Sequence, residues 1–229
     1  MARLPRLIVP SQPHHIIQSG NDGLLVFRDS EDYQRFLVWL KESARELKVA
    51  IHAYVLMPNH FHLLATPSTQ QGLAQMMQRL GRYYVPWFNA KHGRSGTLFQ
   101  GRFKTSLIEA APYFMLCSRY VETNPVRSQL VSDPIDYAWS SYAHHAGARP
   151  DPVITDHVSY WALGNTPFQR EAAYIEIAKA GLTTAELSIL EAAVLKGWPL
   201  ASDAFKAELQ QNSPIQVIPA KRGRPFKRV

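Results

Sequence analysis

Apolar side chains gather in four short runs within the first 110 residues. The runs at 14–20 and 49–57 contain β-branched residues, and the run at 60–66 follows the second one after the turn pair Pro58-Asn59. These features are typical of strands, and the short connection predicts that the second and third strands form a hairpin. The run at 97–109 alternates apolar side chains with polar and basic ones, which predicts a fourth strand with one basic face.

Apolar residues at helical spacing predict three helices between and after these strands, at 28–47, 72–93 and 111–127. The second helix contains Pro86, so we expect it to be interrupted or kinked there. The third should end near Thr123, because a proline follows two residues later and pushes the residue before it out of the helical region.

The order of these elements predicts the fold. Strand, helix, two strands, helix, strand and a final helix is the order of split-βαβ, ferredoxin-like (RRM-like) α+β folds. We expect an antiparallel sheet with its helices packed on one face. Residues 1–132 would form this domain, 133–170 an irregular connecting segment, 171–213 a helical C-terminal extension and 214–229 a basic tail.

Composition and charge narrow the class of partner. The formal net charge is +7 and the estimated pI is about 9.6, which favours a polyanion such as nucleic acid. Cys117 is the single cysteine, so no internal disulfide can form. The sequence has no long apolar run and no apolar N-terminal stretch of signal-peptide length. We therefore expect a cytoplasmic protein with no membrane partner.

The stretch LMPNHFHLLATP places two histidines two residues apart in an apolar run. Positions two apart on a strand project from the same face, so His60 and His62 point together while Phe61 points to the other side. Two convergent imidazoles bind a divalent cation and leave coordination positions open for a substrate, as a catalytic metal requires. The alternative is that one histidine is hydrogen-bonded and half-buried and the other has no special role.

The stretch RYVETNPVR adds a second candidate element. Tyr120 and Asn124 lie four residues apart, on one side of a helix. A tyrosine hydroxyl can act as a nucleophile, and an amide oxygen is a hard ligand suited to Mg²⁺. The alternative is that Tyr120 is a core residue and that Asn124 with the following proline only ends the helix.

Six blocks of the sequence resemble, in the same order, the HUH single-tyrosine transposases, and among them the REP-associated tyrosine transposase branch of the IS200-like transposases. The blocks are FRDSEDYQRFLVWLKE, HAYVLMPNHFHLLATP, LGRYYVPWFNAKHGRSGTLFQGRFK, RYVETNPVRSQLV, YAWSSYAHHAG and GWPLASDAFKAEL. The resemblance implies that residues 1–132 are the catalytic domain. It also implies that Tyr120 is the nucleophile and that His60, His62 and Asn124 are the ligands of Mg²⁺ or Mn²⁺.

The reaction that the resemblance implies is metal-dependent cleavage and rejoining of single-stranded DNA at hairpin-forming repetitive extragenic palindromes. The tyrosine attacks a phosphate and leaves a 5′-phosphotyrosine and a free 3′-hydroxyl. The resemblance leaves open whether a monomer or a homodimer acts, and it implies a nucleoid-associated location. Two alternatives remain: a non-cleaving DNA-binding regulator on the same fold, and a metal-dependent nuclease that uses water.

Basic and aromatic side chains supply candidate contacts to the DNA. Arg102, Lys104 and Arg119 are candidate phosphate contacts, with a solvated surface role as the alternative for each. Tyr83 and Trp87 are candidate stacking platforms for unpaired bases, although most aromatic side chains in their segment are expected in the core.

The basic tail carries a last candidate. Arg222 and Arg224 flank a glycine and precede a proline, and this pattern resembles the core of an AT-hook, which lies in the narrow minor groove of A·T-rich DNA. The alternative is a non-specific basic tail that binds phosphates.

Overall fold

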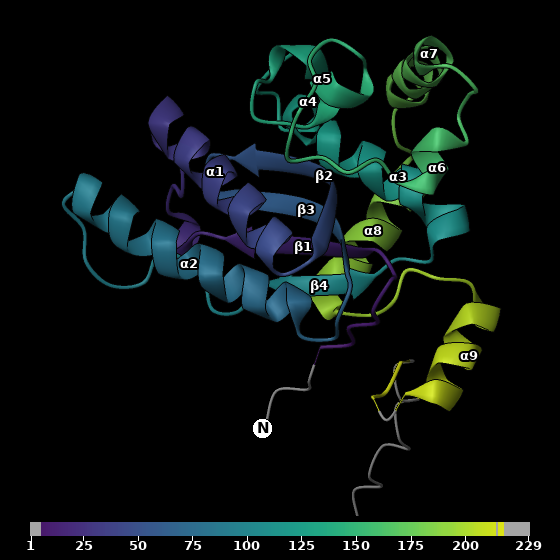
Figure 1. Cartoon of the computed structure of the whole chain (residues 1–229), viewed down its shortest axis with the longest axis horizontal. Coiled ribbons are helices and arrows are strands. Elements are labelled where there is room, and N and C mark those ends of the chain that lie inside the picture. Colours follow the sequence, from purple (N-terminus) through teal and green to yellow (C-terminus); the bar gives the residue numbers. More distant parts are fainter. Residues whose placement is uncertain (1–5, 214, 218–229) are drawn as a thin grey trace, which may run out of the picture.

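The computed structural model describes residues 6–213 and 215–217. Four strands form one antiparallel sheet in the order β2-β3-β1-β4 (Figure 1). They are β1 (His14–Ser19), β2 (Val49–Met57), β3 (His60–Pro67) and β4 (Lys104–Leu107). This is the order that the split-βαβ arrangement requires, so the predicted α+β, ferredoxin-like fold is confirmed.

Two long helices cover one face of the sheet, α1 (Ser30–Glu46) and α2 (Gly72–Lys91). Their apolar sides meet β3: the ring of Phe36 on α1 lies 4.7 Å from that of Phe61 and 5.1 Å from that of Tyr84 on α2. All three rings belong to the main hydrophobic core. Burial of such large side chains is the dominant favourable contribution to folding, so this layer anchors the sheet.

The opposite face is covered by α3 (Ala110–Glu122) and α8 (Thr184–Lys196). Phe114 and Val121 of α3 and Leu190 of α8 pack there against Val55 and Leu64. The sequence predicted that the helices pack on one face of the sheet. This is correct for α1 and α2, but α3 and α8 cover the other face (Figure 1). The reason is that β2 and β3 carry apolar side chains on both faces, and a strand of that kind needs a layer on each side.

Two elements differ from their predicted form. The fourth strand was expected at 97–109 and spans only Lys104–Leu107, because Gly101 just before it has a positive φ of 58° that interrupts an extended chain. Helix α2 is not interrupted at Pro86. Pro86 is exposed, while its neighbours Tyr84 and Phe88 are fully buried, so core packing holds the helix together on both sides of the proline.

The residues after α3 contain more helix than predicted. Segment 133–170 was expected to be irregular, but it includes short helices, and the first long helix of the extension begins at residue 167. The remaining helices are η1 (Asn21–Gly23), α4 (Asn124–Arg127), η2 (Pro134–Asp136), α5 (Tyr142–His145), α6 (Val158–Trp161), α7 (Pro167–Lys179) and α9 (Asp203–Asn212). In the part of the chain that the structure describes, no helix has both the length and the apolar character needed to cross a membrane.

These later segments cover both outer strands of the sheet. Along β2, the N–H of Thr155 donates to the carbonyl oxygen of Ile51 at 2.7 Å. Along β4, the N–H of Leu200 donates to the carbonyl oxygen of Leu107 at 2.8 Å. Such bonds protect strand edges that would otherwise offer unpaired backbone groups to another chain. The extension thus packs directly on the sheet, and the predicted division of the chain at residues 132, 170 and 213 stays a prediction.

Candidate active site

The strand register places three histidines on the face that α3 covers. His60 and His62 lie two residues apart on β3, and Ile17 of β1 pairs with His62, so His15 on β1 projects from the same face. The ring of Tyr120 on α3 lies over this face, 5.7 Å from the ring of His62 and 5.6 Å from that of His15. The ring of His60 lies 5.1 Å from that of His62. The structure therefore brings His60, His62 and Tyr120 together.

The hydrogen bonds of the two histidines among the predicted metal ligands involve Nδ1 of each ring and leave each Nε2 without a protein partner in the described part of the chain. Nδ1 of His60 lies 2.7 Å from Oδ1 of Asn59, and Nδ1 of His62 lies 2.8 Å from Nε2 of His15. Burial lowers the pKa of His60 and lowers the pKa of His62 well below its ordinary value, so both imidazoles are neutral near pH 7. A neutral imidazole with a free Nε2 is the form that binds a metal ion, so this pair fits a divalent cation.

Tyr120 lies beside a cation that the sequence reading missed. Only 6% of its surface is exposed, and burial raises the pKa of its phenol to about 12, against the opposing charge of Arg127. The Cζ atom of Arg127 lies 4.4 Å from the centre of the Tyr120 ring. Its terminal nitrogens donate to the carbonyl oxygen of Tyr120 and to Oγ1 of Thr123, both at 2.7 Å. These bonds hold a guanidinium next to the phenol, where it can stabilise negative charge.

Asn124 opens the short helix α4, just after α3 ends. It is 8% exposed, and its Oδ1 accepts a hydrogen bond from Oγ of Ser128 at 3.1 Å. In residues 6–213 no hydrogen bond joins Asn124 to His60 or His62. Its predicted role as the third metal ligand therefore rests on its amide oxygen, a suitable ligand for Mg²⁺, and on the resemblance, and this role stays a prediction.

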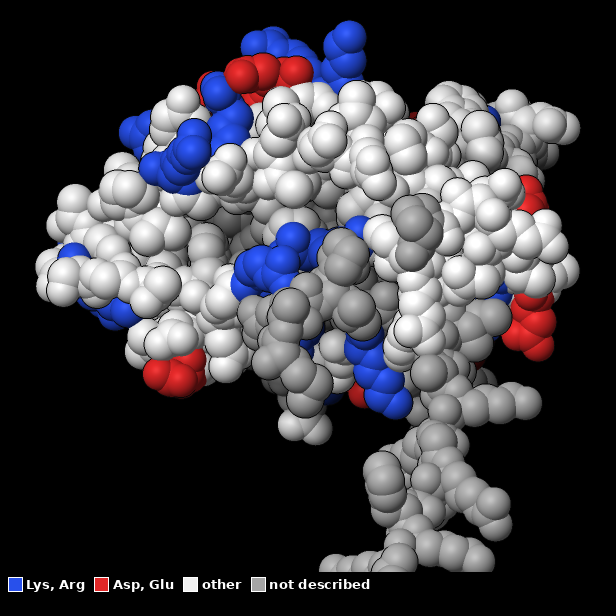
Figure 2. Space-filling view, turned by 90° about the horizontal axis from the view of Figure 1, so that it is seen from below, with Lys and Arg blue, Asp and Glu red and all other residues white. Residues whose placement is uncertain are grey.

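Two of the predicted phosphate contacts lie beside a groove at the edge of the sheet. Lys104 pairs with Ile17, which also pairs with His62, so the side chains of Lys104 and His62 project from the same face, two strands or about 10 Å apart. Arg102 and Lys104 are exposed. The groove is lined by Arg102, Lys104, Lys196, Arg6, Phe103 and Trp198, among others. On the face seen in Figure 2, one group of Lys and Arg side chains lies near the centre, and another lies along the upper edge beside acidic side chains.

The other predicted DNA contacts lie elsewhere. Arg119 is engaged inside the protein: its guanidinium donates to Oε1 of Glu186 on α8 at 3.1 Å and to the carbonyl oxygen of Ile177 at 3.2 Å. Tyr83 and Trp87 belong to α2, on the face of the sheet opposite the histidines, and both rings contact Trp39. The structure does not bring these three residues to the site. Arg222 and Arg224 lie outside the described residues.

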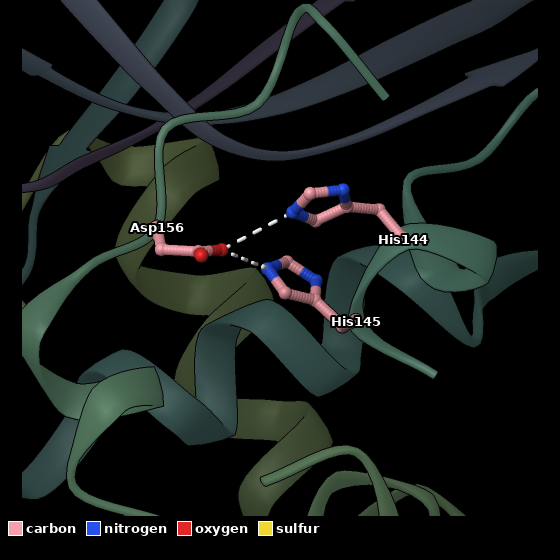
Figure 3. Close-up of side chains that lie close together, drawn as sticks. All are labelled: His144, His145 and Asp156. Carbon is pink, nitrogen blue, oxygen red and sulfur yellow. Dashed lines mark hydrogen bonds and ion pairs between the residues drawn. The ribbon is translucent and has the colours of Figure 1, made fainter. Parts of the chain in front are cut away.

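A second group of potential metal ligands lies on the connecting segment. In Figure 3, His144 and His145 of α5 both point toward the carboxylate of Asp156, and Nε2 of His144 lies 3.2 Å from its Oδ1. Nδ1 of His144 accepts the backbone N–H of Asp151 at 3.0 Å, so the proton of this ring sits on Nε2 and is donated to Asp156. A protonated nitrogen cannot bind a metal ion. We interpret this group as a hydrogen-bond network that holds the segment.

A third group, formed by Asp29, Asp32 and His92, joins the start of α1 to the end of α2. Nζ of Lys91 lies 2.7 Å from Oδ1 of Asp29 and 3.0 Å from Oδ1 of Asp32. The ammonium group thus takes the position that a metal ion would need. This group is an ion-pair network between two helices.

Residues 11–124 match the family described as "Transposase IS200 like". The matched segment holds all four strands, His60, His62 and Tyr120. The chain therefore belongs to the IS200-like transposase family, as the six blocks predicted, and this membership indicates a role in DNA processing.

Solved structures agree with the fold. A REP-associated tyrosine transposase bound to a REP hairpin matches with a TM-score of 0.52 and 16% identity, over 69% of this chain and 92% of that chain. A putative transposase from Deinococcus radiodurans R1 matches with a TM-score of 0.34 and 18% identity, over 56% of this chain and 92% of that chain. At these identities the first match shows a shared fold, and the second carries no argument. A search of curated proteins gave no match.

Proposed function

We propose that the protein is a single-tyrosine HUH transposase of the REP-associated branch, which cleaves and rejoins single-stranded DNA with Mg²⁺ or Mn²⁺. The observation that carries the proposal is the contact of the Tyr120 ring with His62, beside His60, on one face of the sheet. The family match and the hairpin bound by the solved relative support hairpin DNA as the partner, and we take repetitive extragenic palindromes as the target.

In the proposed reaction, the phenol oxygen of Tyr120 attacks the scissile phosphorus. The bond from phosphorus to the 3′ oxygen of the preceding nucleotide breaks as the bond to tyrosine forms, and the phenol proton is transferred to the departing 3′ oxygen. The products are a 5′-phosphotyrosine and a 3′-hydroxyl, and the energy of the phosphodiester is kept for rejoining. Attack by the 3′-hydroxyl reverses the step and releases Tyr120.

The side chains around Tyr120 have separate tasks in this reaction. His60 and His62, through Nε2, and Asn124, through Oδ1, would hold the divalent ion. When bound, that ion supplies Lewis-acid stabilisation of the phosphate oxygens and helps to align the phosphorus. Burial of Tyr120 disfavours its phenolate form, and the positive charge of Arg127 beside the ring favours that form. The exposed side chains of Arg102 and Lys104 would bind neighbouring phosphates along the groove.

The test is the formation of a covalent adduct. The protein is incubated with Mn²⁺ and labelled single strands that carry palindromic hairpins, and the products are separated under denaturing conditions. The parent protein should give a slow-migrating protein–DNA species, and Tyr120→Phe should give none while it still binds the DNA. Tyr113→Phe, on the same helix, is the matched control and should keep the adduct. His60→Ala and His62→Ala should each reduce it strongly.

The same experiment separates the two alternatives. A nuclease that uses water would still cut the DNA after Tyr120→Phe and would give no adduct in the parent protein. A non-cleaving regulator would bind in a salt-sensitive way, with no cut product, and would keep that binding after loss of both histidines. The proposal includes action as a monomer or a homodimer, which the size of the active species would decide. It also includes a cytoplasmic, nucleoid-associated location, which imaging of the protein in cells would test.

A further inference from the structure

His15 is a buried imidazole in the candidate site that the reaction above does not use. It has no exposed surface, and its Nε2 lies 2.8 Å from Nδ1 of His62. The two rings are stacked at 5.1 Å, and the ring of Tyr120 meets His15 edge-on at 5.6 Å. Within the described residues its other nitrogen, Nδ1, is buried without a hydrogen-bond partner. A buried polar group in this position calls for a role.

The bond between His15 and His62 allows two proton arrangements. If His15 donates from Nε2, then Nδ1 of His62 accepts, and the proton of the neutral His62 ring sits on Nε2. A metal ion cannot bind there. If instead His62 donates from Nδ1, its Nε2 carries a free lone pair and His15 keeps its own proton on Nδ1. Only the second arrangement makes His62 a metal ligand.

We propose that His15 is the positioning residue of the metal site. It accepts the Nδ1 proton of His62, holds the imidazole of His62 so that Nε2 is free to bind the metal ion, and packs edge-on against the ring of Tyr120. This inference rests on the proposed function, in which His62 is a ligand. Partners of this kind fix the orientation and tautomer of ligating histidines, and their loss costs about 10- to 100-fold in metal affinity or activity.

His60 and His62 differ in the hydrogen-bond partner of their Nδ1 atoms. The Nδ1 atom of His60 faces the amide oxygen Oδ1 of Asn59, which can only accept, so the proton of His60 stays on Nδ1 with or without metal. His15 can accept or donate, so the proton between His15 and His62 is not fixed by the protein alone. Metal binding should therefore select one arrangement at His62 and leave that of His60 unchanged.

Two substitutions separate this role from a contribution to folding. His15→Phe keeps a ring against Tyr120 but removes the acceptor. His15→Gln places an amide oxygen near the position of Nε2, so it keeps an acceptor. His14→Gln is the matched control, because His14 is the adjacent buried histidine, projects from the other face of β1 and bonds to the backbone of Val9 and Gln12.

The experiment measures Mn²⁺ affinity of the full chain without DNA, by titration calorimetry, with thermal unfolding as the check on folding. His15→Phe should weaken Mn²⁺ binding about 10- to 100-fold, and His15→Gln should restore it to within a few-fold of the parent. His14→Gln should leave it unchanged. Nitrogen NMR of labelled imidazoles gives an independent readout on the parent protein: added Mg²⁺ should place the His62 proton on Nδ1.

Different results overturn different claims. If His62→Ala abolishes Mn²⁺ binding while His15→Phe leaves it at the parent level, the positioning role is wrong and the proposed function stands. The same holds if His15→Gln binds as weakly as His15→Phe, or if the His62 proton stays on Nε2 with Mg²⁺ bound. If the parent binds no Mn²⁺, or binds it equally after His62→Ala, the metal role of His62 and this inference both fail. Should His15→Phe not fold, the NMR measurement on the parent decides.

Discussion

At the scale of single residues, the site places Tyr120, the proposed nucleophile, next to a cation that favours its ionised form. Burial raises the pKa of Tyr120 to about 12, so only a very small fraction is phenolate near pH 7. Arg127 opposes this shift, and its guanidinium is held by the carbonyl oxygen of Tyr120 and by Thr123. A cation fixed in advance stabilises developing charge without reorganising during the reaction.

This arrangement predicts a large effect of replacing Arg127. Arg127→Gln should slow adduct formation in single-turnover assays by about 100- to 1,000-fold, the usual cost of losing one fixed donor at a site of developing charge. Arg127→Lys should lie between that variant and the parent, because it keeps the charge but loses the two-pronged geometry. Arg35→Gln, on the exposed side of α1, is the control and should react like the parent. Unchanged cleavage by Arg127→Gln would remove Arg127 from the mechanism.

At the scale of elements, the position of Tyr120 depends on how the end of α3 is anchored. Glu122, two residues after Tyr120, is fully buried and accepts hydrogen bonds from Ser141, from Tyr174 on α7 and from Nδ1 of His145 on α5, the last at 2.8 Å. This carboxylate ties the tyrosine helix to two later helices. A buried charge needs such partners, because an unpaired one would be strongly destabilising.

The network predicts a pH-dependent stability. Burial alone would lower the pKa of His145, but Glu122 outweighs it, with Asp156 and Asp151 adding to the effect, and the pKa lies above its ordinary value of 6.5. The rings of Tyr160 and Tyr174 also face this imidazole. A pKa raised by folding means that the native state binds the proton more tightly, so its stabilising effect is complete below pH 6.5 and is lost as pH rises through the folded-state pKa.

Urea unfolding at a series of pH values from about 6 to 9 measures this effect, and the parent protein should lose stability over the upper part of that range. His145→Gln keeps a hydrogen-bond donor toward Glu122 but cannot titrate, so its stability should change less with pH. His144→Gln leaves His145 in place and should show the slope of the parent. Equal slopes in all three proteins would contradict a charged His145 at this position.

At the scale of the whole molecule, the side chains proposed to bind metal and DNA lie on neighbouring strands of the sheet. Lys104 on β4, Ile17 on β1 and His62 on β3 stand opposite one another, so the basic groove lies on the same face as His60 and His62, the proposed metal ligands. Helices α1 and α2 occupy the other face and carry the main core. The helices that form the main core thus lie on one face of the sheet, and the side chains that would bind DNA lie on the other.

This separation predicts which cations govern DNA binding. Each phosphate contact to single-stranded DNA contributes about −0.7 to the slope of log affinity against log salt concentration. Lys104→Gln and Lys196→Gln should each reduce the magnitude of that slope by about this amount. Lys41→Gln, at another exposed lysine, on α1, should leave the slope unchanged. If Lys41→Gln alters the slope and the groove variants do not, the DNA lies on the other face.

Much of the fold could be predicted because its signals are local. The β-branched residues in 49–57, the apolar run at 60–66 after the turn pair Pro58-Asn59 and the helical spacing in 28–47 are each signals within a short stretch of sequence, and all three elements appear within two residues of the expected bounds. The fourth strand was overestimated because a positive φ at Gly101 leaves no signal in an alternating pattern. Helix α2 passes Pro86 because packing across the sheet outweighs the local preference.

The sequence by itself determined the α+β order, the family, the shared face of His60 and His62 and the helix that carries Tyr120, since each follows from spacing within a single segment or from matched blocks. Only the tertiary structure decided that His15 bonds to His62, 47 residues away, and that Arg119 turns inward to Glu186, 67 residues away. Such contacts depend on strand register and on which face a helix covers, and neither is set by the residues that make the contact.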